Sequence, residues 1–152
     1  CRKAGPKLKK FKYSLETVYQ FKLQVLDKVK EEYAIKQQEV LNQQSLINRL
    51  QEELFHYEEE FERVKQEGAS IETIMMYVSG IERMEKRIGK EKDELIRRTV
   101  IAEEKKREVI KANVDTNAFE KLKEKKLEEY RIQGQKAEEQ FIEEFVSHAM
   151  KA

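Results

Sequence analysis

The sequence has few of the residues that cross-link a small fold or interrupt a helix. Its 152 residues include one cysteine, one proline, five glycines and no tryptophan. A single cysteine excludes a disulfide framework or a cysteine-based metal site within one chain. Because proline and glycine are the usual helix breakers, their scarcity leaves few points at which a helix must end. We therefore expect long helices.

Long apolar runs and an excess of one charge are also missing. The longest apolar stretch, residues 74–78, is far shorter than the ~20 residues that a membrane-spanning helix needs. No apolar signal-peptide region follows the basic start, so we expect a soluble, cytoplasmic protein. The 31 basic and 30 acidic side chains almost cancel, which argues against a nucleic-acid-binding protein.

A seven-residue repeat is the most informative pattern that is present. Two positions of each heptad form the pattern, and all of them except Gln43 are apolar. The eight positions are Val40, Gln43, Ile47, Leu50, Leu54, Tyr57, Phe61 and Val64. Most residues between them are polar or charged. An apolar stripe this narrow is typical of a coiled-coil seam, in which a helix buries one strip against another helix.

One break divides the chain into two helical regions. Gly68 can end one helix and Ser70 can cap the next. We predict a helix over about 14–66, a turn at 67–70 and a second helical region over about 71–147. Together they form a single coiled-coil domain, residues 13–149, and the basic residues 1–12 before it are expected to be a disordered lead.

The short connection predicts an all-α fold, a long antiparallel two-helix hairpin that is a monomer by itself. A turn centred between residues 68 and 69 pairs positions whose numbers add to about 137. This register places Val18 opposite Phe119, and Leu15 opposite Leu122. These residues are apolar on both helices, which supports the hairpin.

Two parts of the hairpin are expected to depart from the heptad. Before residue 40 we interpret Val18, Val29 and Val40 as an eleven-residue spacing. After the turn, Gly80 and Gly89 each destabilise a helix by ~1 kcal/mol relative to alanine. They predict a kinked segment or a short separate helix, whose apolar stripe is Ile71, Ile74, Val78, Ile81, Met84 and Ile88.

Two apolar clusters are candidates for partner binding. The register leaves residues 125–148 without a partner in the chain, yet this segment continues an apolar stripe through Leu127, Tyr130, Phe141 and Phe145. Two alternatives are that the first helix extends backwards through Phe11 and Tyr13, or that a dimer covers the stripe. The second cluster, at the turn, is either an adaptable docking surface or seam filling: Leu54, Tyr57, Phe61, Tyr77, Ile81 and Met84.

No arrangement of residues predicts catalysis. His56 has Glu52 and Glu60 one helical turn away, but a glutamate-rich helix produces such neighbours by chance. The glycines are isolated, so no phosphate-binding loop is present. Two long helices also offer no concave pocket for chemistry. We therefore predict no catalytic, cofactor-binding or metal-binding residues, and a protein that is not an enzyme.

Three segments together resemble the flagellar FliJ family. The stretch Phe11-Lys-Tyr-Ser-Leu-Glu-Thr-Val18 is similar to the start of these proteins, and residues 119–130 with 138–144 are similar to their C-terminal helix. Residues 68–71 and 77–84 are similar to their central segment. In order and spacing, the resemblance covers residues 9–149.

The resemblance implies a non-enzymatic stalk or chaperone of the flagellar type III export apparatus, similar to the central stalk of rotary ATPases. Its ends would bind the hexameric export ATPase through Leu127, Tyr130, Phe141 and Phe145. The turn cluster would meet the soluble domain of the membrane export gate, with export chaperones as further partners. The location would be cytoplasmic, peripheral at the inner face of the membrane. Alternatives are a structural coiled-coil scaffold, or the stalk of a virulence-type secretion or vacuolar-type rotary ATPase.

Overall fold

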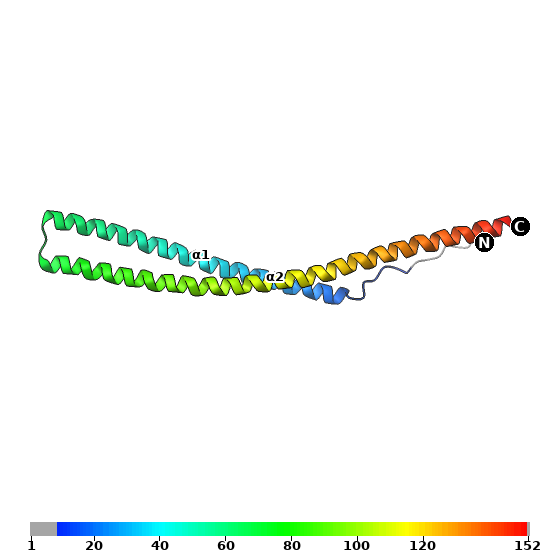
Figure 1. The fold of residues 1–152 in the computed structure, drawn as a ribbon, viewed down its shortest axis with the longest axis horizontal. Coiled ribbons are helices and arrows are strands. Elements are labelled where there is room, and N and C mark those ends of the chain that lie inside the picture. Colours follow the sequence, from blue (N-terminus) through cyan, green and yellow to red (C-terminus); the bar gives the residue numbers. More distant parts are fainter. Residues whose placement is uncertain (1–8, 152) are drawn as a thin grey trace. The chain divides into compact units, whose positions relative to one another are not determined.

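The computed structural model describes residues 9–151 and contains two helices, with no strand in that range. Helix α1 spans Glu16–Glu67 and helix α2 spans Ile71–Met150 (Figure 1). The two helices pack against each other as a helical hairpin, which confirms the predicted all-α fold class. Of the basic lead, residues 1–8 lie outside the described residues.

The connection between the helices is short because one of its residues ends α1 and another caps α2. Gly68 has a φ of 87°, a left-handed conformation that glycine adopts without the steric cost of a Cβ atom, and it ends α1. Two residues later the Ser70 hydroxyl accepts a hydrogen bond from the Thr73 backbone N–H at 3.2 Å. This is the N-cap arrangement that satisfies a free donor at the start of α2.

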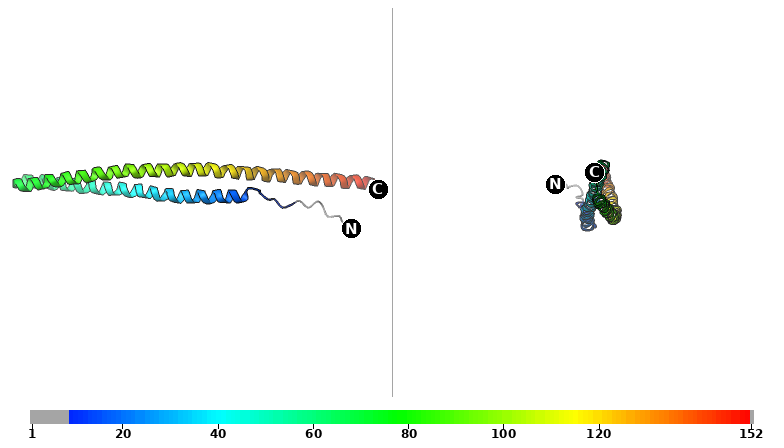
Figure 2. Two further views of the ribbon diagram at one scale, coloured as in Figure 1. Left: turned by 90° about the horizontal axis from the view of Figure 1, so that it is seen from below. Right: turned by 90° about the vertical axis from the view of Figure 1, so that its left-hand side faces the viewer.

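Contacts divide the hairpin into two units. The turn unit comprises residues 28–109, and the described part of the terminal unit comprises residues 9–27 and 110–151. Each unit contains a segment of α1 and a segment of α2. In the turn unit these segments run side by side from the connection (Figure 2).

The turn unit has the predicted heptad seam on α1. All eight positions from Val40 to Val64 are buried or half-buried, and Ile47 is only 2% exposed. Helix α2 supplies a matching seven-residue series, whose members are likewise buried or half-buried: Ile74, Ile81, Ile88, Leu95, Ala102 and Val109. The two series therefore meet along one narrow strip, which is the coiled-coil geometry that the sequence indicates.

A buried polar residue and two polar contacts fix the register of the turn unit. Gln43 is buried, and its amide donates to the backbone carbonyl of Glu91 at 3.0 Å. A polar residue at a seam position disfavours other alignments, because a slip would leave it unpaired. Tyr77 meets Glu60 and Lys105 meets Glu32, and the numbers of each pair add to 137. The predicted register is confirmed.

The segment after the turn is part of α2 and not the separate short helix that was one of the two predicted alternatives. Helix α2 continues without interruption through Gly80 and Gly89. Its buried stripe also differs from the predicted one, because Ile71 and Val78 are exposed whereas Tyr77 is buried. The seam follows the heptad that starts at Ile74, in which successive seam residues are alternately three and four positions apart. Tyr77 therefore lies in the seam and Val78 does not.

The two glycines have different surroundings, which predicts opposite effects of the same substitution. A Cβ atom on Gly80 would lie 2.5 Å from the Tyr57 hydroxyl oxygen and 2.8 Å from a ring carbon, whereas one on Gly89 would meet nothing within 4 Å. We expect Gly89→Ala to stabilise the hairpin by about 0.5–1 kcal/mol through helix propensity. Gly80→Ala should destabilise it by about 1–2 kcal/mol, because the overpacked ring must move.

Urea unfolding followed by helical circular dichroism measures both changes. The two variants serve as controls for each other, since the gain in intrinsic helix propensity is the same. Stabilisation by Gly80→Ala would show that the packing of the Tyr57 ring does not require a glycine at position 80. The glycine is otherwise required there, because the ring packs directly on the α2 backbone.

In the terminal unit the heptad also continues, which corrects the expected eleven-residue spacing. Leu26 is buried and Tyr19 is half-buried, seven residues apart, whereas Val18 is 40% exposed. Lys22 occupies the intermediate seam position. Its amine lies 3.9 Å from the Asp115 carboxylate, so the aliphatic stem covers the seam while the charge reaches the edge. A lysine at a seam position conceals the repeat from a purely apolar pattern search.

Candidate interaction surfaces

The last part of α2 carries exposed apolar residues on more than one face. Leu127 is exposed, Phe145 is 67% exposed, and Phe141 is half-buried. A second set was not predicted: Ile142, Val146 and Met150, spaced four residues apart, line an open groove of about 450 Å³. Their four-residue spacing is a helical signal that was available in the sequence. We call these six residues the terminal surface.

Tyr130, the remaining residue of the predicted terminal cluster, is not freely exposed. It is half-buried because its ring contacts Phe11, with ring centroids 5.5 Å apart and planes inclined by 51°. Its hydroxyl donates a hydrogen bond of 2.6 Å to the Lys9 backbone carbonyl. The expectation that α2 lacks an intrachain partner beyond residue 125 is therefore corrected at this position. The partner is non-helical chain, not a backward extension of α1.

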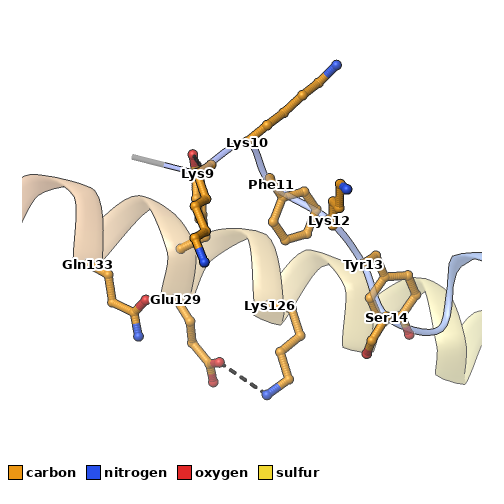
Figure 3. A pocket seen from close by; sticks show the side chains of 10 residues that line it. Lys9, Lys10, Phe11, Lys12, Tyr13, Ser14, Lys126, Glu129 and Gln133 are labelled. Atoms are coloured by element: carbon orange, nitrogen blue, oxygen red, sulfur yellow. Dashed lines mark hydrogen bonds and ion pairs between the residues drawn. The ribbon is translucent and has the colours of Figure 1, made fainter. Parts of the chain in front are cut away.

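The lead strap, residues 9–13, runs along α2 before α1 begins. Figure 3 shows that Phe11 and Tyr13 face α2, whereas Lys10 and Lys12 point away from it. Tyr13 is buried, and its hydroxyl donates to the Phe119 carbonyl at 3.1 Å. Lys9 and Phe11 fall in the lead that we expected to be disordered, and both contact Tyr130 of α2.

The residues of the predicted turn cluster are buried or half-buried in the turn unit. Tyr77 is 7% exposed and stacks on Phe61, with ring centroids 5.3 Å apart. The centroid of the Tyr57 ring lies 5.0 Å from the centroid of the Tyr77 ring, with the planes inclined by 32°. A hydrogen bond to the Glu60 carboxylate raises the pKa of Tyr77 above its usual value. The other five members are half-buried, as in the seam-filling alternative: Leu54, Tyr57, Phe61, Ile81 and Met84.

Other residues near the turn are exposed. Ile71, Met75 and Met76 at the start of α2 all present large apolar side chains to solvent. We call these three residues the turn surface. The sequence pattern does not single out this surface, because Met75 and Met76 lie next to the seam residues Ile74 and Tyr77. A short apolar run does not reveal which of its members face outwards.

Ion pairs between α1 and α2 shift the pKa values of the carboxylates and amines that form them. Lys105 bonds Glu32 at 2.8 Å in the turn unit, and Lys123 bonds Glu16 at 2.8 Å in the terminal unit. These bonds lower the pKa of Glu32 and of Glu16 below the ordinary 4.5. They also raise the pKa of Lys105 and Lys123 above 10.5.

The pKa shifts predict that acid destabilises the hairpin. A carboxylate with a lowered folded-state pKa stabilises the fold fully above its unfolded pKa, and that stabilisation disappears as the pH falls through the folded pKa. We expect the melting temperature to fall when the pH drops from 7 to below about 4. The double variant Glu16→Gln/Glu32→Gln should have a lower melting temperature than the parent at pH 7, and its melting temperature should fall less in acid. Parallel melting profiles for parent and variant would exclude these two pairs as the cause.

No metal or membrane feature stands out in the described part of the chain. Among residues 9–151, no group of three or more histidine, cysteine, aspartate or glutamate side chains could hold a metal ion. His56 has its Nδ1 atom 3.5 Å from the Glu59 carboxylate, and both side chains are exposed. Neither described helix has a stretch that is apolar and long enough to cross a membrane.

Comparison with known proteins identifies the family. A family model described as "Flagellar FliJ protein" matches residues 11–152, almost the full length of the sequence. Neither the curated proteins nor the solved structures yielded a match to the chain. The matched range includes both helices and most of the lead strap. With its helical hairpin and this match over nearly its whole length, the chain belongs to the flagellar FliJ family.

Proposed function

We propose that this chain is a non-enzymatic stalk of the flagellar export apparatus that binds the hexameric export ATPase. Membership of the family supports an export-related role. The observation that supports the finer assignment is the terminal surface, because five of its six large apolar residues are exposed near the C-terminal end of α2. Exposed aromatic and methionine side chains are enriched at the centres of protein interfaces.

The terminal surface suits a partner that surrounds the helix. Phe145 and Val146 are neighbours in sequence, so they point in directions about 100° apart on the helix, and both are exposed. A flat partner would cover one of these directions only. A ring of subunits that encloses the end of α2 can cover both, which favours the hexameric ATPase over a partner that docks on one side.

The turn surface is the corresponding candidate for the export gate. Ile71, Met75 and Met76 are flexible or branched apolar side chains exposed beside a tight turn. Methionine adapts its shape to irregular partners, as a contact with a gate domain or with export chaperones requires. In this proposal the protein is cytoplasmic and lies peripherally at the inner face of the membrane.

The first experiment is titration of the purified export ATPase with this chain. We expect a saturable complex and a change in ATPase activity, because the stalk would contact the subunits of the ring. A structural scaffold would leave the ATPase unbound and its activity unchanged. Parallel titrations with a virulence-type secretion ATPase and a vacuolar-type rotary ATPase test the remaining alternatives, and preference for either one would contradict the flagellar assignment.

A further inference from the structure

The lead strap covers a residue that lies between members of the terminal surface. Tyr130 follows Leu127 by three residues and precedes Phe141 by eleven, so all three are on nearly the same side of α2. The Phe11 ring and the Lys9 carbonyl occupy the space that a partner of Tyr130 would need. An open groove of about 650 Å³ lies beside these contacts, between the strap and the side chains of Lys126, Glu129 and Gln133.

The strap is attached more firmly at one end than at the other. Tyr13 is buried, bonds to Phe119 and leads directly into α1, whose Glu16 N–H bonds to the Tyr13 carbonyl at 3.0 Å. At the other end Phe11 is only half-buried, and Lys9, Lys10 and Lys12 are exposed. Segments with little buried surface open locally at low free-energy cost. The Lys9 end can therefore lift off while Tyr13 stays in place.

We propose that residues 9–12 are a displaceable cover, which hides Tyr130 in the free chain and leaves it when the terminal surface binds its partner. This inference rests on the proposed function, because it takes the export ATPase as that partner. Displacement occurs only if the partner gains more from Tyr130 than the strap does. The strap then lowers the apparent affinity for the ATPase and keeps an aromatic residue covered until the ring is present.

Removing the Phe11 ring should strengthen binding to the ATPase. An aromatic pair contributes about 0.5–1.5 kcal/mol beyond its buried area, so Phe11→Ala is expected to bind the ATPase about two- to tenfold more tightly. The matched control is Phe21→Ala, the same truncation at an exposed ring on α1 of the terminal unit. Its affinity should equal that of the parent chain. Weaker binding by Phe11→Ala would show that the strap belongs to the interface, and would overturn the proposal.

The absence of tryptophan makes a direct test possible. A Phe11→Trp chain labelled with 5-fluorotryptophan has a single ¹⁹F resonance that reports whether position 11 is packed on Tyr130. In the free chain, adding the Tyr130→Ala change should move this resonance to the position found in urea. Adding unlabelled ATPase to the Phe11→Trp chain should move it in the same direction.

These measurements separate failure of the cover from failure of the proposed function. If the ATPase binds while the resonance keeps its packed position, the strap is not displaced and the proposal is wrong. If Tyr130→Ala leaves the resonance of the free chain unchanged, position 11 is not packed on Tyr130, which also overturns it. If Tyr130→Ala moves the resonance but the parent does not bind the ATPase, the proposed function fails while the covering of Tyr130 is supported.

Discussion

Ile47→Asp is expected to destabilise the hairpin by about 4 kcal/mol or more, because it places an unpaired carboxylate in the seam. Ile47 is 2% exposed, and its heptad neighbours Gln43 and Leu50 are buried as well. Domains of this size have a total stability of only about 5–15 kcal/mol. Loss of most of the helical circular dichroism at moderate urea concentrations is therefore the expected result.

The matched control is Leu41→Asp. Leu41 is on the same helix, six residues away, but it is 57% exposed. Aspartate has the same unfavourable helix propensity at both positions, which contributes about 0.5 kcal/mol. The difference between the two variants therefore isolates the burial of the charge. Similar urea midpoints for both would mean that the heptad seam does not hold the hairpin together.

The double variant Phe141→Ala/Phe145→Ala is expected to lose at least about 100-fold in affinity for the export ATPase. Aromatic residues at the centre of an interface cost about 2 kcal/mol or more each when truncated, which corresponds to more than tenfold per residue. Phe145 is strongly exposed in the free chain, so its truncation removes little internal packing. Titration of the parent chain and of the double variant with the ATPase ring measures the loss of affinity.

A second double variant, Phe21→Ala/Phe55→Ala, controls for the loss of two phenyl rings. Both rings are exposed on α1, and neither residue belongs to the terminal surface. This control should bind the ATPase as the parent does, and both double variants should melt within a few degrees of the parent. Parent-like binding by Phe141→Ala/Phe145→Ala would contradict the proposed role of the terminal surface. A large loss of its thermal stability would instead make these residues structural.

The fold was predictable from the sequence because a seam of heptads depends on local spacing. Ile47, Leu50 and Leu54 repeat with the period of a two-helix contact, and Gly68 marks the point at which the chain reverses. Together they determine an antiparallel pairing and its register. The interaction surfaces were less predictable, because exposure depends on which neighbours cover a residue. The sequence pattern left two alternatives open for Tyr77, a docking surface or the seam, and its packing against the rings of Phe61 and Tyr57 was not readable from spacing alone.

The sequence by itself determined the helical hairpin, its register and its resemblance to the FliJ family, since each depends on residue types at fixed spacing. Only the tertiary structure decided that Lys22 belongs to the seam and that Tyr130 lies beneath Phe11. The aliphatic part of the Lys22 side chain packs like an apolar side chain because its amine pairs with the Asp115 carboxylate on the other helix. The Phe11–Tyr130 contact joins residues more than a hundred positions apart through a non-helical strap, and no periodic pattern encodes such a contact.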